Sequence, residues 1–197
     1  MKIWKALVVV IAAALVVTAA YATSVVRRGF STRSQPSQLE VAVAHWIRSM
    51  SMPREVKEQA NPWAARATPE VLETARAHWA DHCATCHAND GGGNTEMGRN
   101  LYPKAPDMRS ATTQNLSDGE LYYIIRNGVR LTGMPAWGDA KLAQDDESWQ
   151  LVLFIRHLPV MTAEEAEGMK ALNPKTDADR AEEVQEQNFL NGGELPK

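Results

Sequence analysis

Two thiols and an imidazole stand together in the run Cys83-Ala84-Thr85-Cys86-His87. Each Cys can form a thioether with one vinyl group of a haem, and the adjacent His can turn a ring nitrogen toward the iron as the proximal axial ligand. This spacing is typical of covalent haem attachment. We therefore predict that Cys83, Cys86 and His87 hold one haem c.

The alternatives for this Cys pair are a thioredoxin-like redox pair, half of a zinc site, or an incidental pair. The chain has only 2 Cys, so a zinc site would need scattered His and acidic residues to complete it. A disulfide between Cys83 and Cys86 would close a very small loop, and no βαβ pattern suited to a redox motif is evident nearby. We favour the haem interpretation.

Length and composition indicate one domain of ordinary size with extensions, since the chain has 197 residues, 44% hydrophobic and 23% charged. Charge is uneven: residues 1–68 carry 9 basic and 3 acidic residues (+6), and residues 69–197 carry 12 and 21 (−9). This pattern argues against nucleic-acid binding and suits a membrane-proximal stem that bears an acidic domain. The acidic face meets either basic partners or solvent.

The N-terminus, residues 1–28, is predicted to be a membrane anchor or a signal segment. Ala6–Val26 is 21 residues long, close to the ~20 that span a bilayer, which favours an uncleaved anchor. Ala20-Tyr21-Ala22 offers a small-x-small cleavage pattern, which is the alternative. Arg27, Arg28 and Arg33 follow this segment and oppose export of the chain after it, because positive charge tends to stay on the cytoplasmic side. The location of the later domain outside the cytoplasm is therefore inferred from the haem.

Residues 29–68 are predicted to be a stem with an amphipathic helix. Ser37 and Glu40 have the spacing of a capping box, and Pro53 ends the helix. One apolar stripe follows at helical spacing: Leu39, Val43, Trp46, Ile47 and Met50. The stripe could lie on the membrane surface, but we expect it to pack against the domain that follows.

Residues 69–160 are predicted to form the haem domain. Thr68 as N-cap and Pro69 at the first helical position begin a helix that runs toward Cys83. Ala75 and Trp79, four apart before the Cys pair, resemble the first helix of the class I cytochromes c, although Ala stands where the family has Gly. The resemblance covers Pro69 to Pro159 and implies an all-α class I cytochrome c fold.

Downstream motifs extend the resemblance and imply two ligand roles. Pro106, in Ala105-Pro106-Asp107, resembles the family proline whose carbonyl accepts a hydrogen bond from the proximal His. Met134-Pro135, after a capped helix from Ser117 to Gly128, resembles the distal-ligand loop, so Met134 would be the sixth ligand. A Met is more often core filler, and Met97 and Met108 are the alternative ligands.

Weaker assignments surround this site. Trp137 and Tyr102 are predicted to line the haem edge, and Arg109 or Arg99 to pair with a propionate, although each could equally be surface packing. A last helix starts at the acidic residues from Asp145 and stops before Pro159. In the family this helix crosses the first one, which implies a contact between Trp149 and Trp79.

Three other features have simpler interpretations. The loop of residues 88–94 is rich in residues that tolerate left-handed backbone and approach a cofactor closely; a phosphate-binding loop would need a preceding strand and a following Gly-Lys-Ser/Thr. His78 and His82 lack an evident third ligand, and we expect them and His157 to be exposed. Residues 161–197 are predicted to be an acidic, solvated helical tail, with a docking helix as the alternative.

The sequence predicts a one-electron carrier, not an enzyme, anchored in the cytoplasmic membrane with its haem domain in the periplasm or an equivalent exterior space. Its partners would be a redox donor and a redox acceptor protein. The alternatives are an electron-entry haem subunit of a larger membrane oxidase or reductase, and a haem enzyme or gas sensor in which Met134 is displaced.

Overall fold

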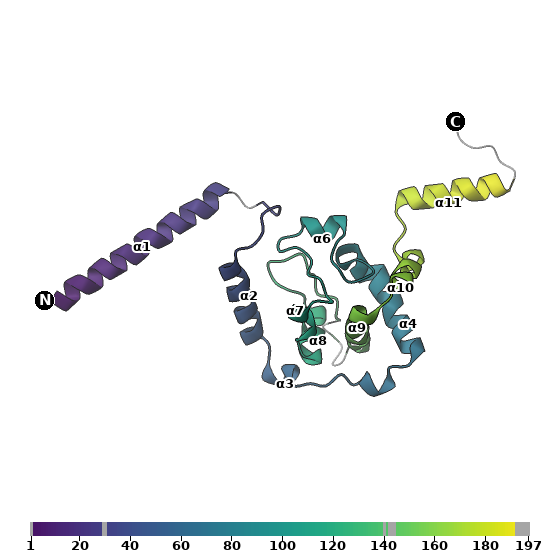
Figure 1. The fold of residues 1–197 in the computed structure, drawn as a ribbon, viewed down its shortest axis with the longest axis horizontal. Coiled ribbons are helices and arrows are strands. Elements are labelled where there is room, and N and C mark those ends of the chain that lie inside the picture. The colour runs from purple at the N-terminus through teal and green to yellow at the C-terminus, as the bar shows by residue number, and fades with distance from the viewer. Residues whose placement is uncertain (1, 29–30, 140, 142–144, 192–197) are drawn as a thin grey trace. The chain divides into compact units, whose positions relative to one another are not determined.

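The computed structural model describes residues 2–28, 31–139, 141 and 145–191. All regular secondary structure in these residues is helical, which confirms the all-α prediction. The chain divides into two units, Met1–Gln35 and Pro36–Lys197, and each is described by itself (Figure 1). The N-terminal unit consists mainly of one long helix, and the second unit contains all the others.

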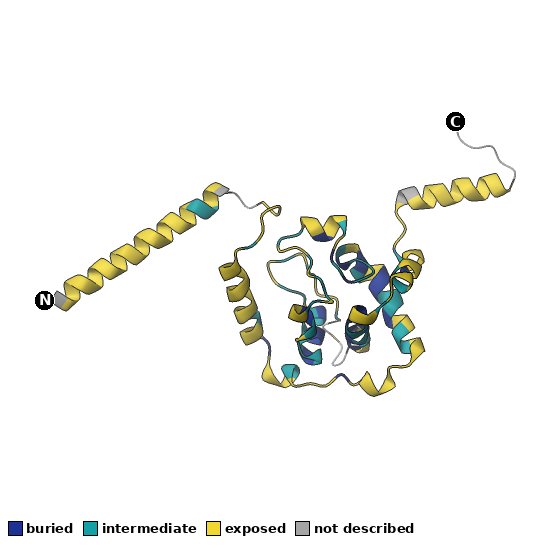
Figure 2. Ribbon diagram, viewed as in Figure 1, coloured by how far each residue is buried: buried dark blue, intermediate teal, exposed yellow. Residues whose placement is uncertain are grey.

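Helix α1 (Lys2–Arg28) is the long helix of the N-terminal unit. Its apolar side chains are exposed along nearly its whole length (Figure 2), and the 25-residue segment Ile3–Arg27 is long and apolar enough to cross a membrane. A membrane anchor and a signal sequence share these properties. The helix is therefore of the kind that the sequence predicts.

Helix α2 (Gln38–Ser51) begins where the capping signal predicts. The Ser37 hydroxyl accepts a hydrogen bond from the Glu40 amide at 3.2 Å. In a full capping box, the Glu40 carboxylate would accept a hydrogen bond from the Ser37 amide. Here the carboxylate accepts one from the Tyr102 hydroxyl at 2.6 Å. A long-range contact has thus taken the place of a local one.

The apolar stripe of α2 does not pack against the domain, so that expectation was wrong. Leu39, Trp46 and Met50 are 70%, 63% and 67% exposed, and no residue of α2 is buried. The helix meets the domain through its polar side instead, where Glu40 binds Tyr102 and Arg48 is half-buried near Glu120. These polar contacts leave the stripe facing outward.

The chain after α2 is packed into the domain. Helix α3 (Arg54–Lys57) lies so close to Gly119 that a Cβ there would stand 1.7 Å from the Val56 carbonyl oxygen. The Ser117 hydroxyl donates to the Lys57 carbonyl at 2.7 Å. Asn61 is buried and donates from Nδ2 to the Trp149 carbonyl at 2.9 Å. This half of the predicted stem therefore forms part of the packed unit, and a short 3₁₀ turn, η1 (Ala64–Arg66), leads on from it.

Short helices make up the domain itself, joined by loops without strands in the residues described. Their order is α4 (Pro69–His78), a π-helical turn η2 (Trp79–Cys83), α5 (Ala84–His87), α6 (Glu96–Asn100), α7 (Ala111–Gln114), α8 (Asp118–Asn127), α9 (Asp146–His157) and a 3₁₀ turn η3 (Leu158–Val160). Thr68, Ser117 and Asp145 cap α4, α8 and α9 at the predicted positions.

The core lies where α4 packs against α9, the helix pair that the resemblance implies. The aromatic partners differ from the expected contact between Trp79 and Trp149. Trp79 packs on Phe154, with ring centroids 5.5 Å apart, and Trp149 stacks on Tyr122 at 4.0 Å with planes 7° apart. Trp149 lies near the start of α9, and Phe154 is the residue of that helix that reaches Trp79.

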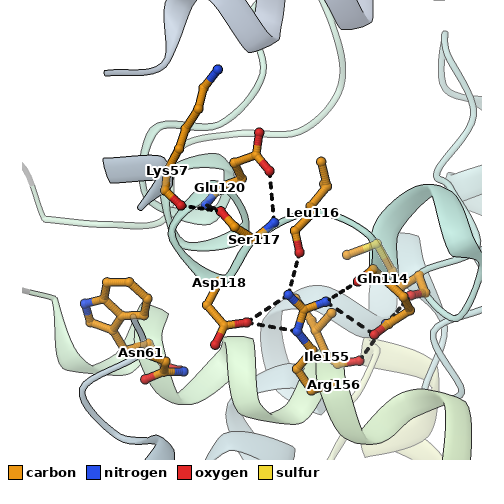
Figure 3. Close-up of polar contacts among 11 residues, drawn as sticks. Lys57, Asn61, Gln114, Leu116, Ser117, Asp118, Glu120, Ile155 and Arg156 are labelled. Atoms are coloured by element: carbon orange, nitrogen blue, oxygen red, sulfur yellow. Dashed lines mark hydrogen bonds and ion pairs between the residues drawn. The ribbon is translucent and has the colours of Figure 1, made fainter. Parts of the chain in front are cut away.

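A half-buried Arg156 on α9 ties the segments around α7 and α8 to the core (Figure 3). Its Nε and Nη2 donate to Asp118 Oδ1 at 2.9 and 2.8 Å. Its Nη1 donates to the Gln114 carbonyl at 2.7 Å, and its Nη2 to the Leu116 carbonyl at 2.5 Å. Gln114 in turn donates from Nε2 to the Ile155 carbonyl at 3.0 Å. A cation satisfied by so many oxygens fixes the loop between α7 and α8.

The C-terminal segment is only partly the solvated tail that the sequence predicts. Helix α10 (Ala163–Gly168) leads to a 3₁₀ turn η4 (Met169–Leu172), whose Met169 is fully buried in the core. Asn173 donates from Nδ2 to the Ala80 carbonyl at 2.9 Å. Beyond it, the described side chains of α11 (Asp177–Leu190) are exposed (Figure 2), and residues 192–197 of the predicted tail lie outside the described residues.

Candidate haem site

The Cys pair and His87 are carried by an unusual continuation of α4. The Thr68 hydroxyl accepts from the Val71 amide at 3.4 Å and starts the helix, with Pro69 at its first position. The helix then widens into the π-helical turn η2 before α5 resumes the α-helical path. Such turns are frequent at functional sites. The sequence predicted the helix that leads to Cys83 but not this widening.

The two thiols are not joined in a disulfide. Burial, and after it the charge of Cys86, raises the pKa of Cys83 to about 12. Burial also raises the pKa of Cys86. A catalytic redox pair requires a lowered thiol pKa, so the site lacks the electrostatics of a thioredoxin-like centre. The structure thus disfavours the main chemical alternative for the pair.

His87 is buried, and its burial favours the neutral form of the ring. Burial lowers its pKa, and the Pro106 carbonyl opposes this effect. Its Nδ1 is buried without a hydrogen bond of normal geometry, even though that carbonyl is nearby. A buried neutral imidazole beside two thiols has the donor set that covalent haem requires, because a ring nitrogen must be unprotonated to bind iron. These residues fit the group.

Trp79 holds the segment around His87 in place. Its ring centroid lies 5.8 Å from that of His87, and its Nε1 donates to the Ala88 carbonyl at 3.0 Å. Trp79 is itself 2% exposed and packed on Phe154. The core of the domain therefore extends directly to the candidate ligand.

The glycine-rich loop after His87 closes on the chain's own backbone. Gly93 has φ +71°, and a Cβ there would lie 2.5 Å from the Ala105 carbonyl oxygen. Its amide donates to the His87 carbonyl at 2.8 Å. This close approach brings the segment that contains Pro106 next to His87. The predicted left-handed backbone is confirmed at Gly93 and at Gly91, where φ is +73°.

Thr95 is a contributor that the sequence reasoning missed. Its hydroxyl donates to the Cys86 carbonyl at 3.2 Å and accepts from the Gly98 amide at 2.8 Å, as the N-cap of α6. A Cβ at Gly98 would stand 2.2 Å from that same Cys86 carbonyl oxygen. A Thr followed by Glu is a helix-start signal, which could have located α6 but not its contact with Cys86.

Met134 lies in a tight loop at the end of α8. Its carbonyl accepts from the Val129 amide at 3.0 Å, and its amide donates to the Thr132 hydroxyl at 3.1 Å. Met134 is half-buried, whereas Met97 is 52% exposed and Met108 packs against the hydrophobic core. Met134 is thus held in a structured loop, away from the core packing that occupies Met108.

The remaining predicted site residues have partners of their own. The hydroxyl of half-buried Tyr102 donates to Glu40 on the stem helix. Arg109 donates from Nε and Nη2 to Asp107, both at 2.9 Å, and from Nη1 to Asp90 at 2.8 Å, so its guanidinium binds two carboxylates. Arg99 donates from Nη1 to the Asn94 side chain at 2.8 Å. The propionate and haem-edge roles stay predictions.

Trp137 and the histidines of the first helix lie together. The Trp137 ring meets the His82 ring edge-on at 5.2 Å, and the His82 ring lies 4.9 Å from that of His78. His78 is not exposed as expected: it is half-buried, its pKa is lowered by burial, and its Nδ1 lies 3.8 Å from Glu147 Oε2. These residues line a shallow cavity beside the loop that carries Met134.

Residues 70–155 match the family of cytochrome C oxidase, cbb3-type, subunit III. This part of the chain is therefore similar to c-type cytochrome domains, which supports the resemblance to the class I cytochromes c. The match begins one residue into α4 and ends near the end of α9, so the matched segment includes the Cys pair, His87 and Met134. Cytochromes of this type bind haem covalently and transfer electrons. No curated protein is similar enough to the chain to be matched.

Proposed function

We propose that this protein is a one-electron carrier that holds one haem c through Cys83 and Cys86, with His87 and Met134 as axial ligands. The observation that carries the proposal is the buried, neutral His87 ring directly after two thiols, in a domain of the c-type cytochrome family. Bound haem would supply a one-electron ferric/ferrous couple.

Each group of residues has a defined task in this proposal. The thiols of Cys83 and Cys86 hold the cofactor, and His87 offers an unprotonated ring nitrogen to the iron. The Met134 thioether occupies the position where oxygen or peroxide would otherwise bind, which suits electron transfer better than substrate activation. The buried rings of Trp79 and Phe154 pack in series next to the His87 ring and exclude water from that side of it. The Pro106 carbonyl orients the His87 ring.

The proposal also places the carrier at a membrane. Helix α1 is the anchor, and the cytochrome domain lies on the outer face of the cytoplasmic membrane, where haem of this type is attached. Mass spectrometry of the mature protein tests attachment and tethering together. We expect a haem mass increment on the peptide that contains Cys83 to His87, and an intact N-terminal segment. An unmodified peptide would reject the haem assignment, and loss of α1 would reject the tether alone.

The spectrum of the ferric protein tests the ligands. We expect a low-spin His/Met signature that Met134→Ala abolishes, with a lower midpoint potential because a neutral thioether favours reduced iron. Met97→Ala is the matched control and leaves both unchanged. High-spin or water-bound iron in the unaltered protein would favour a haem enzyme or gas sensor. An unchanged spectrum and potential in Met134→Ala would remove Met134 from the ligand set.

A second candidate, an electron-entry subunit of a larger membrane oxidase or reductase, is favoured by the family description, which names an oxidase subunit. Purification of the protein from solubilised membranes distinguishes the two functions. A subunit copurifies with larger polypeptides through size-exclusion chromatography, whereas a free-standing carrier elutes alone.

A further inference from the structure

Helix α2 presents an apolar face that nothing in its own domain covers. Leu39, Trp46 and Met50 occupy positions i, i+7 and i+11, which lie within about 40° of one another at 100° per residue. Val43 and Ile47, 44% and 55% exposed, widen the same stripe. Five large apolar side chains on one short helix form a contiguous patch of the kind that marks an interaction site.

Contacts beside and opposite the stripe fix α2 to the cytochrome domain. Glu40 accepts the hydrogen bond from the Tyr102 hydroxyl, and half-buried Arg48 lies near Glu120. The ammonium group of Lys57 donates to the Ser49 hydroxyl at 3.0 Å. At about 100° per residue, Arg48 lies opposite Leu39, and Glu40 lies at the edge of the stripe next to Ile47. Contacts with the domain therefore engage both charged side chains of the helix. Figure 2 shows α2 exposed along its length.

The covalent chain itself indicates what covers this face. Only residues 29–37 separate the end of α1 from the start of α2. These nine residues extend to at most roughly 32 Å. Once α1 is inserted, as the proposed function requires, a bilayer surface is always within reach of α2. Trp is enriched at membrane–water interfaces, and an apolar stripe without charge is what an interfacial helix buries.

We propose that α2 lies on the bilayer surface, with the stripe of Leu39, Trp46 and Met50 buried in the lipid headgroup region. The occupant is lipid rather than a partner protein or a second copy of the chain. Because Glu40 connects α2 to Tyr102, this contact also holds one side of the cytochrome domain against the membrane. The inference rests on the tether in the proposed function.

Photocrosslinking of the full-length protein in phosphatidylcholine/phosphatidylglycerol nanodiscs tests the inference. Benzoylphenylalanine replaces Leu39, Trp46 or Met50 one at a time, and mass spectrometry identifies the adducts. We expect lipid adducts at all three positions, several-fold above those at Val184, an exposed apolar residue of α11 that serves as the matched control. A Met50→Glu change should reduce the lipid adducts at position 46, whereas Val184→Glu should not.

A probe at Leu15 of α1 separates failure of the inference from failure of the tether. Lipid adducts at Leu15 without lipid adducts on the α2 stripe would overturn the inference and leave the anchor in place. Adducts from the stripe to a second copy or to another polypeptide would overturn it equally. If Leu15 forms no lipid adduct, the tether is wrong, and the three stripe positions still decide whether α2 binds lipid.

Discussion

The Trp79 indole lies beside the His87 imidazole, with ring centroids 5.8 Å apart, and donates a 3.0 Å hydrogen bond to the carbonyl of Ala88. Ala88 has φ 63° and ψ 162°, a backbone conformation that L residues rarely adopt. Trp79 thus stabilises a strained residue immediately after the candidate ligand. This arrangement links the packing of α4 and α9 to the orientation of the His87 ring.

Trp79→Phe should lower the free energy of unfolding by about 1–2 kcal/mol, because the part-buried Ala88 carbonyl loses its donor. Guanidinium denaturation of the purified protein measures the change. Trp46→Phe, at an exposed position, is the control and should have little effect. Equal stabilities of the two variants would show that the indole hydrogen bond does not hold this turn.

Ala88→Gly should stabilise the protein by about 1 kcal/mol, because Gly adopts a positive φ without steric cost. Ala77→Gly, within α4, is the control and should destabilise by about 1 kcal/mol through the ordinary cost of Gly in a helix. Thermal unfolding of both variants shows whether their stability changes have opposite signs. If Ala88→Gly destabilises as much as Ala77→Gly does, the backbone strain inferred at Ala88 is absent.

Arg156→Met should destabilise the domain by about 2–3 kcal/mol, because it leaves the Asp118 carboxylate and the Gln114 and Leu116 carbonyls without their donor. Arg54→Met is the control, since the ion pair of Arg54 with Glu58 is largely exposed. Urea denaturation measures the free energy of unfolding of both variants. A stability loss at Arg156 no larger than that at Arg54 would contradict a stabilising role for the half-buried network shown in Figure 3.

The Asp107 and Arg109 pair predicts an acid-dependent loss of stability. The hydrogen bond from Arg109 lowers the pKa of Asp107, so the pair contributes stability above the ordinary aspartate pKa and loses it as pH falls through the lowered value. Asp107→Asn should therefore be less stable at neutral pH by under about 1 kcal/mol, a difference that disappears in strong acid. Denaturation curves across pH measure it, with exposed Glu186→Gln as control. A difference that persists in acid would mean that the ion pair is not its cause.

Gly98→Ala should impair the site directly. A Cβ would stand 2.2 Å from the Cys86 carbonyl oxygen, and backbone at that point cannot yield as a flexible side chain can. We expect a loss of about 1–3 kcal/mol and a lower ratio of covalent haem to protein. Gly168→Ala is the matched control, because no heavy atom lies within 4 Å of the Cβ it adds. Equal haem ratios in the two variants would remove Gly98 from the construction of the site.

Several features were predictable because their causes are local. Ser37, Thr68 and Ser117 cap the helices that they were expected to cap, since a capping side chain reaches an amide only three residues away. The family match to residues 70–155 confirms the cytochrome resemblance, whereas the haem-binding roles of Cys83, Cys86 and His87 stay predictions.

Long-range packing was predicted less well. The sequence suggested a Trp79 contact with Trp149, but both residues found other aromatic partners. It suggested a buried stripe on α2, but the stripe is exposed and the Glu40 carboxylate accepts a hydrogen bond from Tyr102. Met169, expected in a solvated tail, is in the core.

The sequence by itself therefore indicated the helix starts, the adjacent placement of Cys83, Cys86 and His87, and the resemblance to the class I cytochromes c. Only the tertiary structure decided which aromatic rings meet, which face of α2 is free, and how Trp79 and Pro106 surround His87. The physical reason is range: caps and motif spacing depend on atoms a few residues apart. Packing partners are chosen by competition among surfaces that are distant in the chain.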